Sequence, residues 1–576
     1  MIERLDESSR PFAADEHIAV DGQVTGLPEH PPMNHRPWWL IDPAGSLLGF
    51  VAAVCSVTPS LLPRPTTLQG ILTGIAFAIG YLLGVAIWSI VRALLRGKAS
   101  QNMIPRRWWS IYAAVWVLTI AVLSSLAVMW QNEVRSLVSM QPLGGSDLAG
   151  FLFAFLPTAI VLLLAGKGVR IMYLRFRRRT GTPVAAFLST GIVTVAVGGL
   201  ILGAVAGVDR VYHDRNAHPD PKAVQPVSEH RSAGPGSAIA WETLGRHGAA
   251  FVSGGPDAAD IESLTGEEAR EPVRVYAGLE SAPTVEERAA LVVDELERTG
   301  AFERSVLVVA TTTGSGWLEP QTMDALEYLH SGDTAIAAMQ YAYTPSWVSF
   351  VFEPDAPVEA ARVLFDAVEA RWKQLPEDDR PQLIAYGLSL GAHGSQAVFT
   401  GVADLRSRAD GALFVGSPNG SQLWRGLQAA RDPGSPVWQP VLDSGREVRW
   451  MSRAGDEAHL SGTWHQPRVL YLQHATDPVT WLSPELLWRA PEWLESDQRS
   501  SDVSSSMRWI PILTGLQVTI DMLVGEAVPA AYGHNYGDVV LTAWQQVTPD
   551  TGLDSQLINK IQAEVESYSS IPRYEE

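Results

Sequence analysis

The chain has 576 residues, which is more than one hydrophobic core normally serves, so we expect two or more domains. Its formal net charge of −19 argues against nucleic acid as the main partner, because phosphate binding needs a basic surface. A single cysteine, Cys55, excludes an intramolecular disulfide framework.

The first part of the chain predicts a membrane domain behind a polar tail. Residues 1–40 are acidic and lack the positive start of a signal peptide, so we expect a disordered cytoplasmic tail. Residues 41–209 are expected to form an all-α domain of about five transmembrane helices, since about 20 apolar residues cross a bilayer. The apolar stretches are 45–62, 68–91, 108–130, 150–172 and 184–208. The first is short and contains Pro59, so a re-entrant or interfacial segment is its alternative.

Charged loops predict the orientation of these helices. Arginines and lysines concentrate in the loops that follow the second and fourth stretches, whereas the loop at 131–149 holds only Arg135. Basic loops stay in the cytoplasm, so everything after Val208 is expected to be extracytoplasmic. Ionisable residues are almost absent from the spans, which favours an anchor over a transporter. The connection SVTPSLLPRPTTLQG (56–70) is interpreted as a stiff outward hairpin or, alternatively, as a rim that meets lipid headgroups.

The second half predicts an α/β domain. Residues 210–235 are rich in Pro, Asp, His and Ser and are expected to be a linker, and residues 236–576 alternate short apolar runs with amphipathic helical ones. This alternation indicates a doubly wound, mainly parallel sheet. The expected strands are 273–277, 306–310, 335–340, 383–386, 412–415 and 469–473. The expected helices include 284–299, 321–329, 356–374 and 392–399.

One serine lies where a strand turns sharply into a helix. The strand LIAY runs into GLSLG, which places Ser389 between Gly387 and Gly391, and AHGSQAVF continues as a helix. A G-x-S-x-G turn in this setting exposes the serine hydroxyl at the carboxyl edge of the sheet, where such folds carry their sites. We therefore interpret Ser389 as a nucleophile, with the amide of Leu390 as an oxyanion donor.

The partners of that serine are expected later in the chain, in the order acid and then histidine. Asp477 follows an expected strand in RVLYLQHATDPVTW, and His534 lies in the glycine-flanked AAYGHNYGD. In this arrangement the carboxylate orients the imidazole, which takes the serine proton. His393, one helical turn after Ser389, is the weaker candidate for the base, and His474 is a candidate for substrate contact. No expected strand directly precedes His534, because MRWIPILTGLQVTIDMLVGEAV has the pattern of a helix.

The remaining site residues come from loops that follow earlier strands. ATTTGSG follows an expected strand, so Thr312 or Thr313 is expected to supply a second oxyanion amide. Trp317, Tyr341 and Tyr343 lie near expected strand ends and are candidates to line a substrate cleft, although packing beneath loops is an equal alternative.

Several segments together resemble a known family. They are RVYAGLESAPTVEERAALVVDELERTGAFERSVLVVATTTGSGWLEP, EYLHSGDTAIAAMQYAYTPSW, YGLSLGAHGSQAVF and, in the membrane half, TPSLLPRP. The chain resembles the bacterial membrane-anchored alpha/beta-hydrolase family nine over roughly residues 45–570. The resemblance implies an N-terminal membrane domain, a C-terminal hydrolase fold and a serine-centred site carried by Ser389, Asp477 and His534. It does not specify the substrate.

These patterns predict a membrane-anchored serine hydrolase that acts on ester or acyl substrates at the extracytoplasmic face. A lipid or an envelope glycolipid is the expected substrate class, and acyl transfer to a sugar hydroxyl would use the same residues. A noncatalytic envelope scaffold with a hydrolase fold is the alternative. No cofactor or metal is expected, because neither a dinucleotide-binding glycine motif nor metal-ligand spacing is present. The sequence leaves the oligomeric state open.

Overall fold

The computed structural model describes residues 42–94 and 106–568, and the expected N-terminal tail lies outside these residues. Within the described ranges, four helices are long and apolar enough to cross a membrane: α2 (Thr66–Leu94), α3 (Arg106–Leu137), α4 (Gly145–Thr180) and α5 (Thr182–Asn216). α5 extends beyond the end that we expected for the membrane domain. Large apolar side chains stay exposed along α4 and α5, for example Phe153 and Phe187, as lipid contact requires.

The first of the five stretches that we expected to cross the membrane is too short to do so. Its helix, α1 (Pro43–Ser56), has only 14 residues. At about 1.5 Å per residue it is about 21 Å long, short of a hydrocarbon core of about 30 Å. The helix stops before Pro59, Pro63 and Pro65, which lack the amide that helix continuation needs, so residues 57–65 form a non-helical connection.

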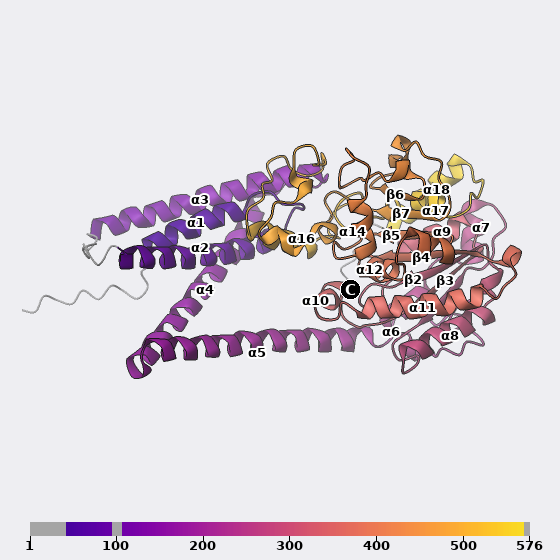
Figure 1. Cartoon of the computed structure of the whole chain (residues 1–576), viewed down its shortest axis with the longest axis horizontal. Helices are drawn as coiled ribbons and strands as arrows, with labels where there is room; N and C mark the ends of the chain where they lie inside the picture. The colour runs from indigo at the N-terminus through magenta and orange to yellow at the C-terminus, as the bar shows by residue number, and fades with distance from the viewer. Residues whose placement is uncertain (1–41, 95–105, 569–576) are drawn as a thin grey trace, which may run out of the picture. The chain divides into compact units, whose positions relative to one another are not determined.

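α1 packs closely on α2 because glycines remove side chains from the contact. A Cβ atom on Gly80 would lie 2.5 Å from the carbonyl oxygen of Leu48, and one on Gly84 would lie 2.5 Å from that of Ala44. Phe77 of α2 then meets Phe50 of α1 edge to face, with ring centroids 5.3 Å apart. Figure 1 shows α1, α2 and α3 running side by side.

The C-terminal half is built on a parallel sheet of seven strands in the order β1-β3-β2-β4-β5-β7-β6. The strands are β1 (Val273–Ala277), β2 (Val306–Thr311), β3 (Thr334–Met339), β4 (Gln382–Leu388), β5 (Gly411–Val415), β6 (Val448–Met451) and β7 (Arg468–Leu472). Most strand residues are fully buried, as in a sheet covered on both faces. This confirms the expected hydrolase-type α/β fold and six of its strands, whereas β6, a four-residue edge strand, was missed.

Helices cover both faces of the sheet (Figure 1). One group that packs together is α8 (Val285–Arg298), α11 (Ala356–Trp372) and α12 (Leu390–Ala397), and another is α9 (Pro320–Leu329), α17 (Val540–Val547) and α18 (Ser555–Ser567). The other helices are α6 (Gly245–Ser253), α7 (Ala258–Thr265), α10 (Ser346–Phe352), α13 (Val402–Arg408), α14 (Gln422–Ala429), α15 (Pro478–Trp481) and α16 (Leu513–Met522). α12 begins directly after β4, and α16 lies in the segment between Asp477 and His534.

Candidate active site

Ser389 occupies the turn between β4 and α12 in a conformation that favours glycine. Its backbone angles are φ 57° and ψ −122°, so the turn is strained. A Cβ atom on Gly387 would lie 2.3 Å from the carbonyl oxygen of Gly391, and one on Gly391 would lie 2.2 Å from that of Thr311. Neither glycine can therefore be replaced without moving the backbone. This is the geometry that presents a serine side chain at the carboxyl edge of the sheet.

Asp477 follows β7 and is fully buried, yet its carboxylate is well supplied with donors. The amide of Val479 donates to Oδ1 at 2.8 Å, and the hydroxyl of Tyr536 donates to Oδ2 at 2.7 Å. Nδ1 of His534 lies 2.8 Å from the same Oδ2 atom. Burial alone would raise the pKa of Asp477, but His534, Tyr536 and Val479 outweigh it and hold this pKa below its usual value. The acid is therefore ionised at neutral pH.

His534 is oriented by the hydrogen bond between its Nδ1 atom and Asp477. A carboxylate beside Nδ1 requires a proton there, so Nδ1 donates to Asp477 and leaves Nε2 with a lone pair. Nε2 is buried and has no hydrogen-bond partner among the described residues. Burial lowers the pKa of His534, but the charge of Asp477 and the hydrogen bond to it raise this pKa above its ordinary value overall. Nε2 is the atom that a general base would use.

The backbone after β5 brings His534 and Ser389 to one place. The amide of Ser389 donates to the carbonyl oxygen of Val415 at 2.9 Å. The next residue, Gly416, has φ 55°, and a Cβ atom there would lie 2.4 Å from Cε1 of His534. The serine backbone therefore contacts Val415, and the imidazole ring lies against the next residue, where only a glycine leaves room for it.

Two backbone amides lie beside the serine turn. Leu390 is the first residue of α12, where the first helical amides lack an intrahelical acceptor. The loop after β2 packs against the next residue, because a Cβ atom on Gly391 would lie 2.8 Å from the carbonyl oxygen of Thr312. The amide of Thr313 donates to the carbonyl oxygen of Trp317 at 3.0 Å, so it is already engaged. Of the two threonines that the sequence left open, Thr312 stays the candidate for the second oxyanion donor.

His474, a candidate for substrate contact, has both ring nitrogens beside backbone oxygens. It is fully buried, with Nδ1 2.9 Å from the carbonyl oxygen of Gly533 and Nε2 3.1 Å from that of Ser452. Its ring stacks on Tyr536 at 4.1 Å between centroids. Both ring nitrogens are therefore occupied by backbone oxygens, and the residue supports the loop that carries His534.

Tyr343, another candidate for substrate contact, is tied to the end of α5. Its hydroxyl donates to Glu280 at 3.0 Å, its carbonyl oxygen accepts from Asn216 at 2.8 Å, and its ring packs edge to face on His213. Asn216 and His213 belong to the end of α5, so Tyr343 connects that helix to the α/β domain.

Trp317 and Tyr341 remain candidates for substrate contact. Both are half-buried and pack against the core. The hydroxyl of Tyr341 has no hydrogen-bond partner among the described residues. His393, the weaker candidate for the base, lies 3.1 Å from the hydroxyl of Ser421, and burial lowers its pKa.

Tyr536 is the residue that sequence reasoning missed. The motif HNYG placed a tyrosine two residues after the candidate base, and this spacing was the available signal. Its hydroxyl is shared between the Asp477 carboxylate and the amide of His474, from which it accepts at 3.2 Å.

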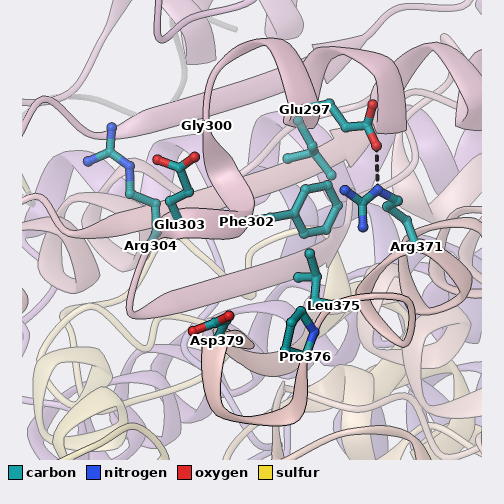
Figure 2. Close-up of a pocket in the computed structure, with 10 residues that line it drawn as sticks. Glu297, Gly300, Phe302, Glu303, Arg304, Arg371, Leu375, Pro376 and Asp379 are labelled. Carbon is teal, nitrogen blue, oxygen red and sulfur yellow. Dashed lines mark hydrogen bonds and ion pairs between the residues drawn. The ribbon is translucent and has the colours of Figure 1, made fainter.

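A surface pocket of about 590 Å³ lies elsewhere on the domain, between the end of α8 and the end of α11 (Figure 2). Its lining residues precede β2 and β4, so the pocket opens at the amino edge of the sheet, whereas Ser389 follows β4 at the carboxyl edge. Glu297 and Arg371 form an ion pair across it, beside the ring of Phe302. Sheets of this kind bind substrates at the carboxyl edge, so we do not assign this pocket to the active site.

Comparison with known proteins agrees with this architecture. Residues 273–561 match the alpha/beta-hydrolase family, and residues 57–256 match the N-terminal region that accompanies it. The chain belongs to the alpha/beta-hydrolase family. No curated protein matches it significantly. A solved structure of Trichoderma reesei cutinase in complex with a C11Y4 phosphonate inhibitor is 13% identical, covers 33% of this chain and 74% of its own, and has a TM-score of 0.17.

Proposed function

We propose that the protein is a membrane-anchored serine hydrolase with Ser389 as nucleophile, His534 as general base and Asp477 as the orienting acid. The observation that carries this proposal is the Asp477–His534 pair, 2.8 Å apart and buried, with Nε2 of the imidazole unpartnered beside the serine turn. A structural histidine in a hydrolase core would have both nitrogens satisfied, as His474 does.

The reaction follows from this arrangement. Oγ of Ser389 attacks the acyl carbonyl carbon while its proton passes to Nε2 of His534. The amides of Leu390 and Thr312 stabilise the oxyanion. The ester C–O bond then breaks, and the leaving alcohol takes the proton from His534. Water, or a sugar hydroxyl in an acyl transfer, attacks the acyl-serine in the same way and regenerates the enzyme.

The substrate is proposed to be an ester or acyl chain of a lipid or an envelope glycolipid. Apolar side chains are exposed on the segment between the acid and the histidine: Leu487, Trp488, Ile512 and Leu523. This segment includes α16, which packs against α2 and whose Gln517 donates to the carbonyl oxygen of Thr58, two residues after the end of α1. Exposed apolar groups so close to a membrane span suit contact with a lipid surface.

The proposed orientation places this site outside the cytoplasm. Arg177, Arg178 and Arg179 end α4, and basic helix ends stay in the cytoplasm. Because α2 to α5 make four crossings, the connection before α2 and the domain after α5 lie on the same outer side. The short α1 affects only the side on which the N-terminal tail lies.

Ester turnover tests this function. Full-length protein in detergent is assayed with p-nitrophenyl esters of increasing acyl length, beside Ser389→Ala. We expect turnover in the wild type and about a 10³-fold or greater loss in the variant, as for a removed nucleophile. Equal turnover by the folded variant would reject the assignment and leave the noncatalytic scaffold as the better account.

A further inference from the structure

The connection between α1 and α2 is buried against the catalytic domain. Leu61 and Leu62 are 1% and 0% exposed, and they belong to the same hydrophobic core as the strands of the sheet. The side chains of Ser60 and Arg64 are equally buried. A hairpin that only joined two membrane helices would lie at the surface and be solvated, so this burial calls for another role.

An ion pair fixes the connection to α16. Nε of Arg64 donates to Oδ1 of Asp521 at 2.6 Å, and both side chains are 0% exposed. The amide of Leu61 donates to Oδ2 of Asp521 at 3.1 Å, and the hydroxyl of Ser60 donates to the same atom. The remaining Arg64 donors are used by Gln69 and by the α16 backbone. Such a satisfied buried pair specifies one arrangement of the two segments.

The turn that follows α16 is hydrogen-bonded to His534. The amide of Val524 donates to the carbonyl oxygen of Asp521 at 3.0 Å, and the carbonyl oxygen of the next residue, Gly525, accepts from the amide of His534 at 2.7 Å. The connection also reaches the histidine loop without α16. A Cβ atom on Gly533 would lie 3.1 Å from Cδ1 of Leu62, so Leu62 packs against the residue that precedes His534.

We propose that the 57–65 connection is a positioning element for His534, with Leu62 and Arg64 of the membrane half holding the imidazole in line with Ser389. The inference rests on the proposed function, since it assigns a part of the membrane half to the proposed site. It makes the membrane half a component of the catalytic machinery in addition to an anchor. A displacement of about 1 Å in such a group can reduce a rate by about 10²-fold.

The test compares full-length variants in detergent. Leu62→Ala removes the contact with Gly533, Leu62→Met is the conservative variant, and Arg64→Lys keeps the charge but removes the forked donor set. Glu327→Gln is the matched control, because it breaks another buried ion pair, with Arg274 at 2.6 Å, on α9 of the same domain. Each variant is measured by hydrogen exchange with mass spectrometry and by its rate of reaction with a fluorophosphonate.

We expect Leu62→Ala and Arg64→Lys to speed amide exchange in residues 524–537 while residues 382–397 keep their protection. The labelling rate should fall by about 10²-fold, with KM for a short ester unchanged, because His534 acts on the serine proton. Leu62→Met should show the amide exchange and the labelling rate of the wild type, and Glu327→Gln should change neither quantity.

Unchanged exchange in residues 524–537 of folded Leu62→Ala would overturn the positioning role. The exchange measurement tests the positioning role without any need for activity. A wild-type protein that does not react with the fluorophosphonate would count against the proposed function instead.

Discussion

The hydroxyl of Tyr536 donates to the same carboxylate oxygen of Asp477 that faces His534, at 2.7 Å. This oxygen thus has, besides His534, a donor that stabilises the ionised form of the acid. Such a hydrogen bond reduces the basicity of the carboxylate and, through it, the pKa of the imidazole.

Replacement of this tyrosine separates its electrostatic effect from its packing. Tyr536→Phe removes a hydrogen bond to a charged group, so the free energy of unfolding should fall by about 1.5–3 kcal/mol. The carboxylate becomes more basic, so the midpoint of the pH–rate curve should move to higher pH. Denaturant unfolding and labelling rates across the pH range measure the two effects. Tyr471→Phe is the control, because its buried hydroxyl bonds the uncharged Gln396 and should leave the midpoint in place.

The raised pKa of His534 sets the pH dependence of the wild type. The base acts when neutral, so the rate should rise with pH, with a midpoint above about 6.5. In Asp477→Asn the charge is gone and burial dominates, so the residual activity should have a midpoint below about 6.5, with a rate about 10⁴-fold lower. A midpoint that stays in place in this variant would contradict the assigned pair.

The same two shifts predict opposite effects on stability. The pKa of Asp477 is lowered on folding, so its contribution is present above its unfolded pKa and is lost as the pH falls through the folded value. The pKa of His534 is raised, so its contribution is complete below about pH 6.5 and is lost as the pH rises through the folded value. Asp477→Asn should therefore flatten the pH dependence of the melting temperature on both sides.

The serine turn should not tolerate a side chain at either flanking glycine. Gly391→Ala places a methyl group against a backbone oxygen at 2.2 Å, so it should cost about 1–3 kcal/mol or more and displace Ser389. Melting temperature and labelling rate should both fall. Gly420→Ala, where nothing lies within 4 Å, is the control and should change neither.

The orientation can be tested with a single introduced thiol. Val227 is 91% exposed beyond α5, so Val227→Cys in a Cys55→Ser background should react with a membrane-impermeant maleimide on intact cells whose outer envelope is permeabilised. Arg178→Cys, at the end of α4, should react only after lysis. The reverse pattern would place the catalytic domain in the cytoplasm.

The fold was predictable because its signals are local. Buried parallel strands give continuous apolar runs, and the glycines around Ser389 identify its turn without reference to the rest of the chain. β6 was missed because its four residues at the sheet edge, VRWM, include a charge and are too few to show a period. The length of α1 was overestimated because apolar residues continue beyond Ser56, where the helix ends ahead of the prolines.

Most of the site depends on contacts that no local pattern contains. The chain order of Ser389, Asp477 and His534 gave a hypothesis for the acid and the base, but the roles of His474 and Tyr343 required their partners to be known. Arg64 and Asp521 are 457 positions apart, and nothing in either segment indicates the other. Their pairing is a property of the folded chain.

Fluorophosphonate labelling of the full-length protein tests the central claim most directly. Wild type is compared with Ser389→Ala and His534→Ala at equal folded concentration, and mass spectrometry locates the adduct. The account predicts one adduct on Ser389 in the wild type, none in Ser389→Ala and a labelling rate reduced by about 10³-fold or more in His534→Ala. An adduct on another residue, or wild-type labelling that persists without His534, would contradict it.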